Sequence, residues 1–255
     1  MANFKDWCVL TKNDVNNHRL RTLLPEVDKL HLGIDSLAKT IPGHYASEER
    51  LAALFKRLGK EKVSKFIIEK LPTQKNIRSG DLGEILGSAY LNEYTKFKTG
   101  INKLRWKDHR NMAMRGADLL AVRSHDVLKI KFIKGEVKSR KALSLGVMKE
   151  AYTALSRDNN RPSAHSLAFL ADRLHEEGND ELGSLIDEAL LTYQIKDTQI
   201  SHLIFTFSGN EPTKILSFAL SNYKGAISQY SVGLHISEHQ EFIKAVYEKV
   251  IADGY

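Results

Sequence analysis

The stretches RGADLLAV (residues 115–122) and VLKIKFIKGEVK (residues 127–138) decide the fold that this sequence predicts. The first contains a short apolar run, and the second opens on an alternation of apolar and basic residues, so each predicts a β-strand. Consecutive strands usually pair as neighbours. Side chains two residues apart in a strand share a face, so we expect Glu136 and Lys138 to project to one side, with Asp118 beside Glu136.

These residues carry the groups that a metal-dependent hydrolysis needs. The carboxylates of Asp118 and Glu136 and the backbone carbonyl of Val137 form an all-oxygen donor set of the kind that Mg²⁺ prefers. Lys138 can orient or deprotonate a water and offset charge that builds on a phosphate. Each residue alone also has a structural interpretation, because an acid before an apolar strand often makes a local turn bond, and E-x-K is common on exposed strand ends.

The preceding segment GDLGEILGSAYL (residues 80–91) predicts a helix over residues 81–96. Asp81 and Glu84 have the spacing of a capping box, which would begin this helix. One side carries an apolar stripe, and the other carries almost no bulk, since its members are Gly80, Gly83, Glu84, Gly87 and Ser88. A side without bulk lets another part of the chain approach closely, so we expect tight packing of this helix.

Helical and strand periodicities continue on both sides of these segments. Helices are expected over residues 47–58, 60–71, 143–155, 163–177, 181–193 and 238–251, and strands over residues 101–106, 202–207 and 230–236. This order predicts an α/β fold. We place a mainly helical N-terminal extension at residues 1–75 and the α/β domain at residues 76–255, with a helical insert at about residues 160–194.

The formal net charge of +7 hides a strong asymmetry along the 255 residues. Residues 1–171 carry a net +14, whereas residues 172–255 carry −7. Basic residues are densest at 53–79, 96–115 and 129–141. Such segregation favours a surface that binds a polyanion, most often a nucleic acid, although solvated basic helix faces give the same pattern.

Composition excludes several classes of protein. The single cysteine, Cys8, rules out an intrachain disulfide framework and a cysteine-based zinc site. No apolar run approaches the ~20 residues of a membrane helix, and the first residues lack the apolar core of a secretory signal, so we expect a cytoplasmic protein without membrane contact. The histidines lack the paired spacing of zinc ligands, and no G-x-S-x-G motif is present.

The helix–strand–strand order, with Glu84, Asp118 and the triplet at residues 136–138, resembles the PD-(D/E)XK nuclease superfamily, although Ala117 stands at the position of the name-giving proline. More narrowly, GDLGEILGSAYL, RGADLLAV and GEVKSR, in this order and spacing, look like the HamA family, the nuclease effectors of Hachiman antiphage defence systems. The resemblance implies a restriction-endonuclease-like core with a mixed central sheet flanked by helices. It also implies a DNA nuclease with little sequence preference, restrained by a partner helicase of the HamB type in a hetero-complex.

The resemblance assigns roles residue by residue. Glu84, Asp118, Glu136 and Lys138 would form the catalytic set, and Asp118, Glu136, Glu84 and the Val137 carbonyl would hold Mg²⁺ or Mn²⁺. Contacts to DNA phosphates are expected from the basic residues near the motifs, namely Lys103, Arg105, Lys107, Arg110, Arg115, Arg140, Lys141 and Lys149. Two alternatives stay open: a catalytically silent DNA-binding or adaptor subunit of a helicase complex, and a restriction or repair nuclease of the same fold.

Overall fold

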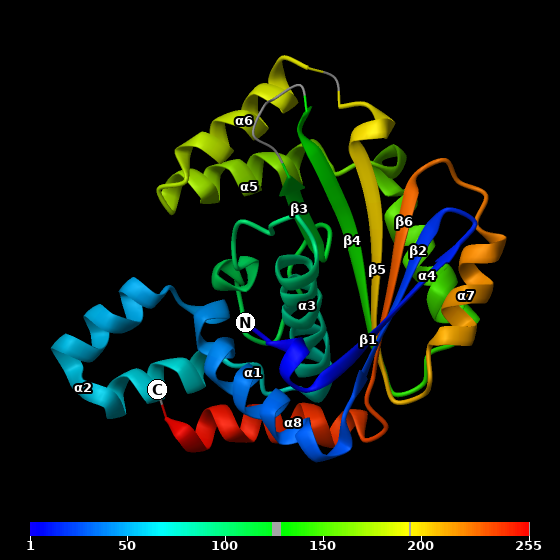
Figure 1. Ribbon diagram of the computed structural model, residues 1–255. Helices are drawn as coiled ribbons and strands as arrows, with labels where there is room; N and C mark the ends of the chain where they lie inside the picture. The colour runs from blue at the N-terminus through cyan, green and yellow to red at the C-terminus, as the bar shows by residue number, and fades with distance from the viewer. Residues whose placement is uncertain (124–128, 194, 255) are drawn as a thin grey trace.

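One six-stranded sheet forms the centre of the computed structural model, which describes residues 1–123, 129–193 and 195–254 (Figure 1). The strand order is β1-β2-β6-β5-β4-β3. The strands are β1 (Cys8–Val15), β2 (His18–Pro25), β3 (Leu119–Arg123), β4 (Lys131–Arg140), β5 (Ile200–Ser208) and β6 (Ser228–His235). The inner strands β2, β6, β5 and β4 run parallel, whereas the edge strands β1 and β3 run antiparallel to their neighbours. A mixed sheet flanked by helices confirms the predicted fold class.

Helices cover both faces of the sheet and one of its ends (Figure 1). They are α1 (Leu30–Tyr45), α2 (Glu48–Lys70), α3 (Lys75–Tyr94), α4 (Leu145–Ser156), α5 (Ala164–Glu176), α6 (Asp180–Leu191), α7 (Thr213–Asn222) and α8 (His239–Asp253). One core cluster lies between the sheet and α1, α3 and α8, and a second lies under α4 and α7. A third joins the α5–α6 pair to the end of β3 and β4.

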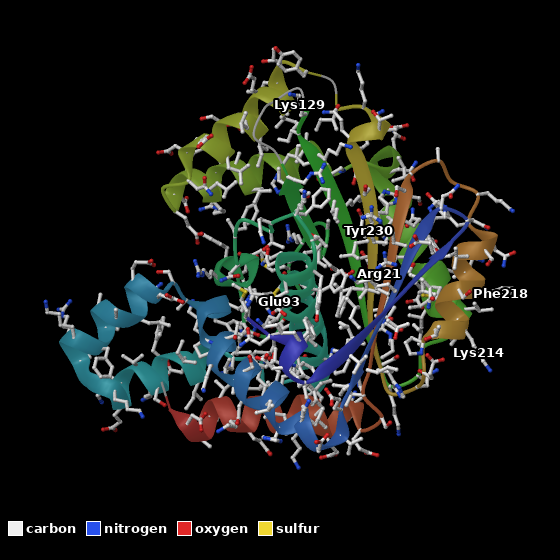
Figure 2. All side chains as sticks on the ribbon, viewed as in Figure 1. Arg21, Glu93, Lys129, Lys214, Phe218 and Tyr230 are labelled. Atoms are coloured by element: carbon white, nitrogen blue, oxygen red, sulfur yellow. The ribbon has the colours of Figure 1, made fainter. Side chains whose placement is uncertain are left out.

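The outer side of α7 is solvent-exposed, as Phe218 shows with 57% of its surface accessible (Figure 2). Among the described residues, no helix combines the length and the apolar character that crossing a membrane requires.

The first 75 residues share the core of the rest of the chain. Their hairpin β1–β2 extends the sheet, because β2 pairs in parallel with β6. Trp7 is fully buried and stacks on Phe242 of α8 with ring centroids 6.0 Å apart. The short apolar stretch at residues 7–10 therefore leads into an edge hairpin that ties the N-terminal extension to the sheet. Helix α2 joins the two expected helices across Gly59, whose φ of 79° breaks the helical geometry.

Several expected boundaries differ from the structure. Residues 101–106 do not form a strand, because they contain the 3-10 helix Lys103–Trp106. Helix α3 begins at Lys75, so Asp81 lies inside it and the predicted capping box is wrong. Helix α7 was not expected. Residues 127 and 128 of the expected strand, residue 194 of the insert and residue 255 lie outside the described residues.

Candidate active site

Glycines on α3 let this helix lie directly against the strands that carry the motif. A Cβ atom on Gly83 would lie 2.8 Å from Cγ1 of Val137, and one on Gly87 would lie 2.7 Å from Cδ1 of Leu119. Both distances are shorter than packed side chains tolerate, so larger residues would push α3 away from β3 and β4. The prediction of close helix packing is confirmed, and it places the next residue, Glu84, near the start of β3.

Asp118 lies at the edge of the sheet, immediately before β3. Strand β3 begins at Leu119, which pairs with Gly135 of β4. Among the described residues, the part of β4 after Gly135 therefore has no partner residue in β3. At this point the backbone N–H of Val137 donates to Oδ2 of Asp118 at 2.8 Å. The Asp118 carboxylate thus takes the place of a strand partner and is held against the β4 backbone.

Glu136 and Lys138 lie together on one face of β4. Their side chains form an ion pair with 2.9 Å between Oε1 and Nζ, and both are mostly buried. Burial raises the pKa of Glu136, the negative charge of Asp118 raises it further, and Lys138 opposes the rise. The expectation that these two side chains share a face and that Asp118 lies nearby is confirmed.

Glu84 approaches Asp118 from the other face of the sheet. Val137 packs against α3, and side chains alternate along a strand, so Glu136 and Lys138 point away from α3. Asp118 lies close to the acids on both faces of the sheet, because its charge acts on Glu84 as well as on Glu136. The four predicted residues therefore meet around Asp118 rather than on one common face.

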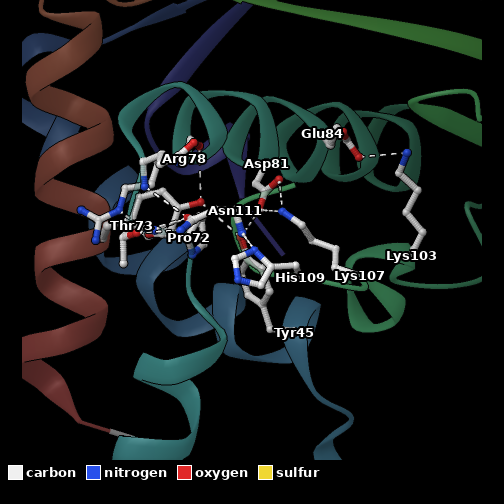
Figure 3. Close-up of polar contacts among 12 residues, drawn as sticks. Tyr45, Pro72, Thr73, Arg78, Asp81, Glu84, Lys103, Lys107, His109 and Asn111 are labelled. Carbon is white, nitrogen blue, oxygen red and sulfur yellow. Dashed lines mark hydrogen bonds and ion pairs between the residues drawn. The ribbon is translucent and has the colours of Figure 1, made fainter. Parts of the chain in front are cut away.

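Lys103 connects Glu84 to the segment that carries Asp118 (Figure 3). Its Nζ lies 3.0 Å from Oε2 of Glu84 and donates to the carbonyl of Ala117 at 3.0 Å. The Oε2 atom of Glu84 is shielded from solvent and has no other polar partner among the described residues, and its contact with Lys103 is an ion pair rather than an aligned hydrogen bond. Burial raises the pKa of Glu84 to about 7, with Lys103 lowering it and Asp118 raising it.

The donor set suits a hard divalent cation held by few protein ligands. In the described ranges, no three His, Cys, Asp or Glu side chains converge closely enough to form a preformed metal cage. Mg²⁺ commonly uses only one or two carboxylates and completes its shell with water and substrate phosphates. Asp118 and Glu136 supply two such carboxylates, and burial together with the negative charge of Asp118 disfavours the charged form of Glu136, which a divalent cation would favour. The residues present therefore fit such an ion, for which Asp118 and Glu136 would be the direct donors.

A second buried acid, Asp81, belongs to a structural network (Figure 3). It accepts from Tyr45 at 2.6 Å and pairs with Lys107 at 2.7 Å, and the side chains of Asp81 and Lys107 are each only 4% exposed. Burial raises the pKa of Asp81, and Lys107 opposes this rise. This network fastens α1 and the segment after α3 to the N-terminal half of α3.

The residues predicted to contact DNA divide into two groups. Lys103 and Lys107 pair inside the fold, Arg105 forms an ion pair with Glu177, and Arg110 donates to the carbonyl of Glu69. The exposed members are Arg115, Arg140, Lys141 and Lys149. The internal pairing of Lys103 went unnoticed in the sequence because its partner, Glu84, is 19 positions away in an element of another type. The only sequence signal that pointed to Lys103 was the high density of basic residues at 96–115.

Two comparisons with known proteins show the family of this chain. The family model HamA matches residues 2–250, which include every element of the candidate site. The chain is also similar to "Hachiman protein HamA" from Bacillus cereus, at 26% identity over 243 residues that cover 92% of this chain and 85% of that protein. A family match across nearly the whole chain leads to one conclusion: the chain belongs to the HamA family.

Proposed function

We propose that this protein is a Mg²⁺-dependent DNA nuclease that acts as the effector of a Hachiman antiphage defence system. The observation that carries the proposal is the fixed position of Asp118. Its carboxylate accepts a hydrogen bond from the backbone N–H of Val137, and its charge acts on both Glu84 and Glu136. Acids, a lysine and a strand edge in this arrangement suit hydrolysis of a phosphodiester bond. The name of the relative supports the defence role.

Each residue has a role that its contacts allow. Asp118 and Glu136 would hold the cation together with the Val137 carbonyl, which belongs to the same residue whose N–H meets Asp118. The bound cation supplies positive charge for a phosphoryl oxygen and lowers the pKa of a water. Lys138, two residues from Glu136 on the same face, would position the attacking water. Glu84 would bind a metal-bound water or a second cation after release from Lys103.

Exposed basic side chains next to the site would bind the DNA backbone. Arg140 and Lys141 lie two and three residues after Lys138, and Lys149 lies on the neighbouring helix α4. Contacts of this kind go to phosphates and carry no base information, which fits a nuclease with little sequence preference. A partner helicase would restrain the nuclease in a hetero-complex.

One observation favours the adaptor alternative. Glu84 and Glu136 are each paired with a lysine, so these two carboxylates are neutralised without a metal. A silent subunit would use the same ion pairs purely for folding. Cleavage assays separate the two functions, because a silent subunit binds DNA without cutting it.

The test uses the purified 255-residue protein, alone and with a helicase of the HamB type, on linear and circular DNA. Mg²⁺ or Mn²⁺ should support degradation, and EDTA should abolish it. The double variant Glu136→Ala/Lys138→Ala should lose cleavage and keep most DNA binding, whereas Glu241→Gln on the exposed side of α8 should cleave like wild type. If wild type never cuts under any metal or partner condition, the adaptor function replaces the nuclease.

A further inference from the structure

A pocket of about 270 Å³ opens beside the candidate active site. Its walls come from α3, from the segment between α3 and β3, and from α5. Glu84 and Asp118 both line it, so the pocket and the carboxylates share one boundary. A molecule that occupied this pocket would lie in direct contact with the groups proposed to act on a phosphodiester.

The lining combines aromatic and thioether side chains with a few polar groups. Trp106 and Phe169 meet edge to face with centroids 6.0 Å apart, and Met112 and Met114 add polarisable surface. Arg115 and His165 also line the pocket, and neither side chain has a hydrogen bond or ion pair within the described residues. Flat apolar surfaces with unpaired cationic or donor groups at the rim suit a planar heteroaromatic ligand attached to an anion.

We infer that the pocket takes one unpaired nucleobase of the DNA strand whose phosphodiester lies at the carboxylates. This inference rests on the proposed nuclease function and specifies its substrate as DNA with an unpaired base, such as a single strand, a frayed end or a flipped nucleotide. The pocket lies near the lower limit of small-molecule sites, roughly 300 to 1,000 Å³, so it has room for one base and not for a base pair. Enzymes that modify a nucleobase draw a single base into a pocket, which shows that one unpaired base can be bound in this way.

The position of the aromatic rings explains how a base would help catalysis. Stacking is tolerant of sequence because every base has a flat face. A stacked base next to Glu84 and Asp118 would fix the position of the adjoining phosphate at the carboxylates, while Arg115 contacts a flanking phosphate. The pocket would thus make the protein prefer DNA with unpaired bases over fully paired DNA, without a preference for sequence.

Binding measured in EDTA tests this inference without any cleavage. The probes are fluorescein-labelled dT12, an abasic 12-mer with the same number of phosphates, and dT12 annealed to dA12. We expect wild type to bind dT12 roughly five- to 150-fold more tightly than the abasic strand, because this is the range that stacking of one base contributes, and more tightly than the duplex. Trp106 is one of only two tryptophans, and Trp7 is buried in the core, so fluorescence quenching by dT12 would report directly on this wall.

Two variants locate the effect. Trp106→Leu and Phe169→Leu keep apolar bulk, remove a stacking ring, and should each reduce the preference for dT12 over the abasic strand. Phe218→Leu, on the exposed side of α7, is the matched control and should keep the full preference. Equal binding of dT12 and the abasic strand by wild type would overturn the inference, as would a preference that survives in both pocket variants. Base-dependent binding by a protein that never cleaves DNA would instead overturn the proposed function and leave the pocket assignment standing.

Discussion

Val137 donates its backbone N–H to Oδ2 of Asp118 at 2.8 Å, and this bond fixes the geometry of the candidate active site. It holds the residue before β3 against β4 beyond the point where the two strands stop pairing. The side chain of the same Val137 meets Gly83 of α3. One residue therefore connects Asp118, the strand that carries Glu136 and Lys138, and the helix that carries Glu84.

Replacing Gly83 by alanine should destabilise the protein. Alanine favours helix by up to about 1 kcal/mol over glycine, but the added Cβ would lie 2.8 Å from the stiff, β-branched Val137. Overpacking of this kind costs about 1–3 kcal/mol. The same change at Gly80, where an added Cβ would meet no packed neighbour among the described residues, should stabilise the protein. Urea unfolding of both variants measures the contrast, and a stabilised Gly83→Ala variant would refute this description of the α3 interface.

Lys107→Met should reduce the free energy of unfolding by about 3–5 kcal/mol, since it leaves the buried Asp81 carboxylate without its cation. Asp81→Asn in the same protein should recover part of the loss, because the amide keeps an acceptor for Tyr45 without a charge. Thermal and urea unfolding of the two single variants and the double variant form the necessary cycle. A change below about 0.5 kcal/mol in Lys107→Met would show that this pair does not stabilise the fold.

Lys141→Ala should weaken DNA binding in a salt-dependent way without affecting stability. Loss of one phosphate contact lowers the slope of log Kobs against log salt by about 1. Lys141 is exposed and lies just beyond the end of β4, whereas the control Lys214→Ala lies on α7 (Figure 2). Fluorescence anisotropy at several salt concentrations gives both slopes. Equal slopes for wild type and Lys141→Ala would exclude this residue from the DNA-binding surface.

Glu84→Gln should change how stability depends on pH. Burial raises the pKa of Glu84 from 4.5 to about 7. Between these values the folded protein keeps the proton and the unfolded chain loses it, so wild-type stability falls as pH rises through this window. The total loss is about 3 kcal/mol at 1.36 kcal/mol per pKa unit. Glutamine resembles the protonated acid, so the variant should become more stable relative to wild type as the pH rises from 4 to 8. Urea unfolding across that range provides the measurement, and a difference that does not vary with pH would contradict the raised pKa.

Much of the site could be predicted because its signals are local. The apolar run after Asp118 and the alternation that ends in Glu136 and Lys138 each specify a strand, and two neighbouring strands bring the acids together. The small residues of α3 predicted close packing, which Gly83 and Gly87 show.

Other features depend on contacts between distant parts of the chain. Asp81 has the spacing of a helix cap, yet its partners are Tyr45 and Lys107, 36 and 26 positions away. From the sequence, Lys103 is expected at the surface, and only the tertiary fold places its side chain next to Glu84. The hairpin β1–β2 was missed because its outer strand is mostly exposed, so it lacks a clear apolar alternation.

The most direct test of the nuclease is the rate of DNA cleavage by Asp118→Asn under single-turnover conditions with Mg²⁺. The asparagine oxygen can still accept from the Val137 N–H, so the fold should persist while the charge is lost. With the helicase partner both present and absent, the variant should cleave at least roughly 100-fold more slowly than wild type, because several kcal/mol of transition-state stabilisation depend on the cation that Asp118 holds. Cleavage within about threefold of the wild-type rate would contradict the assignment of this site.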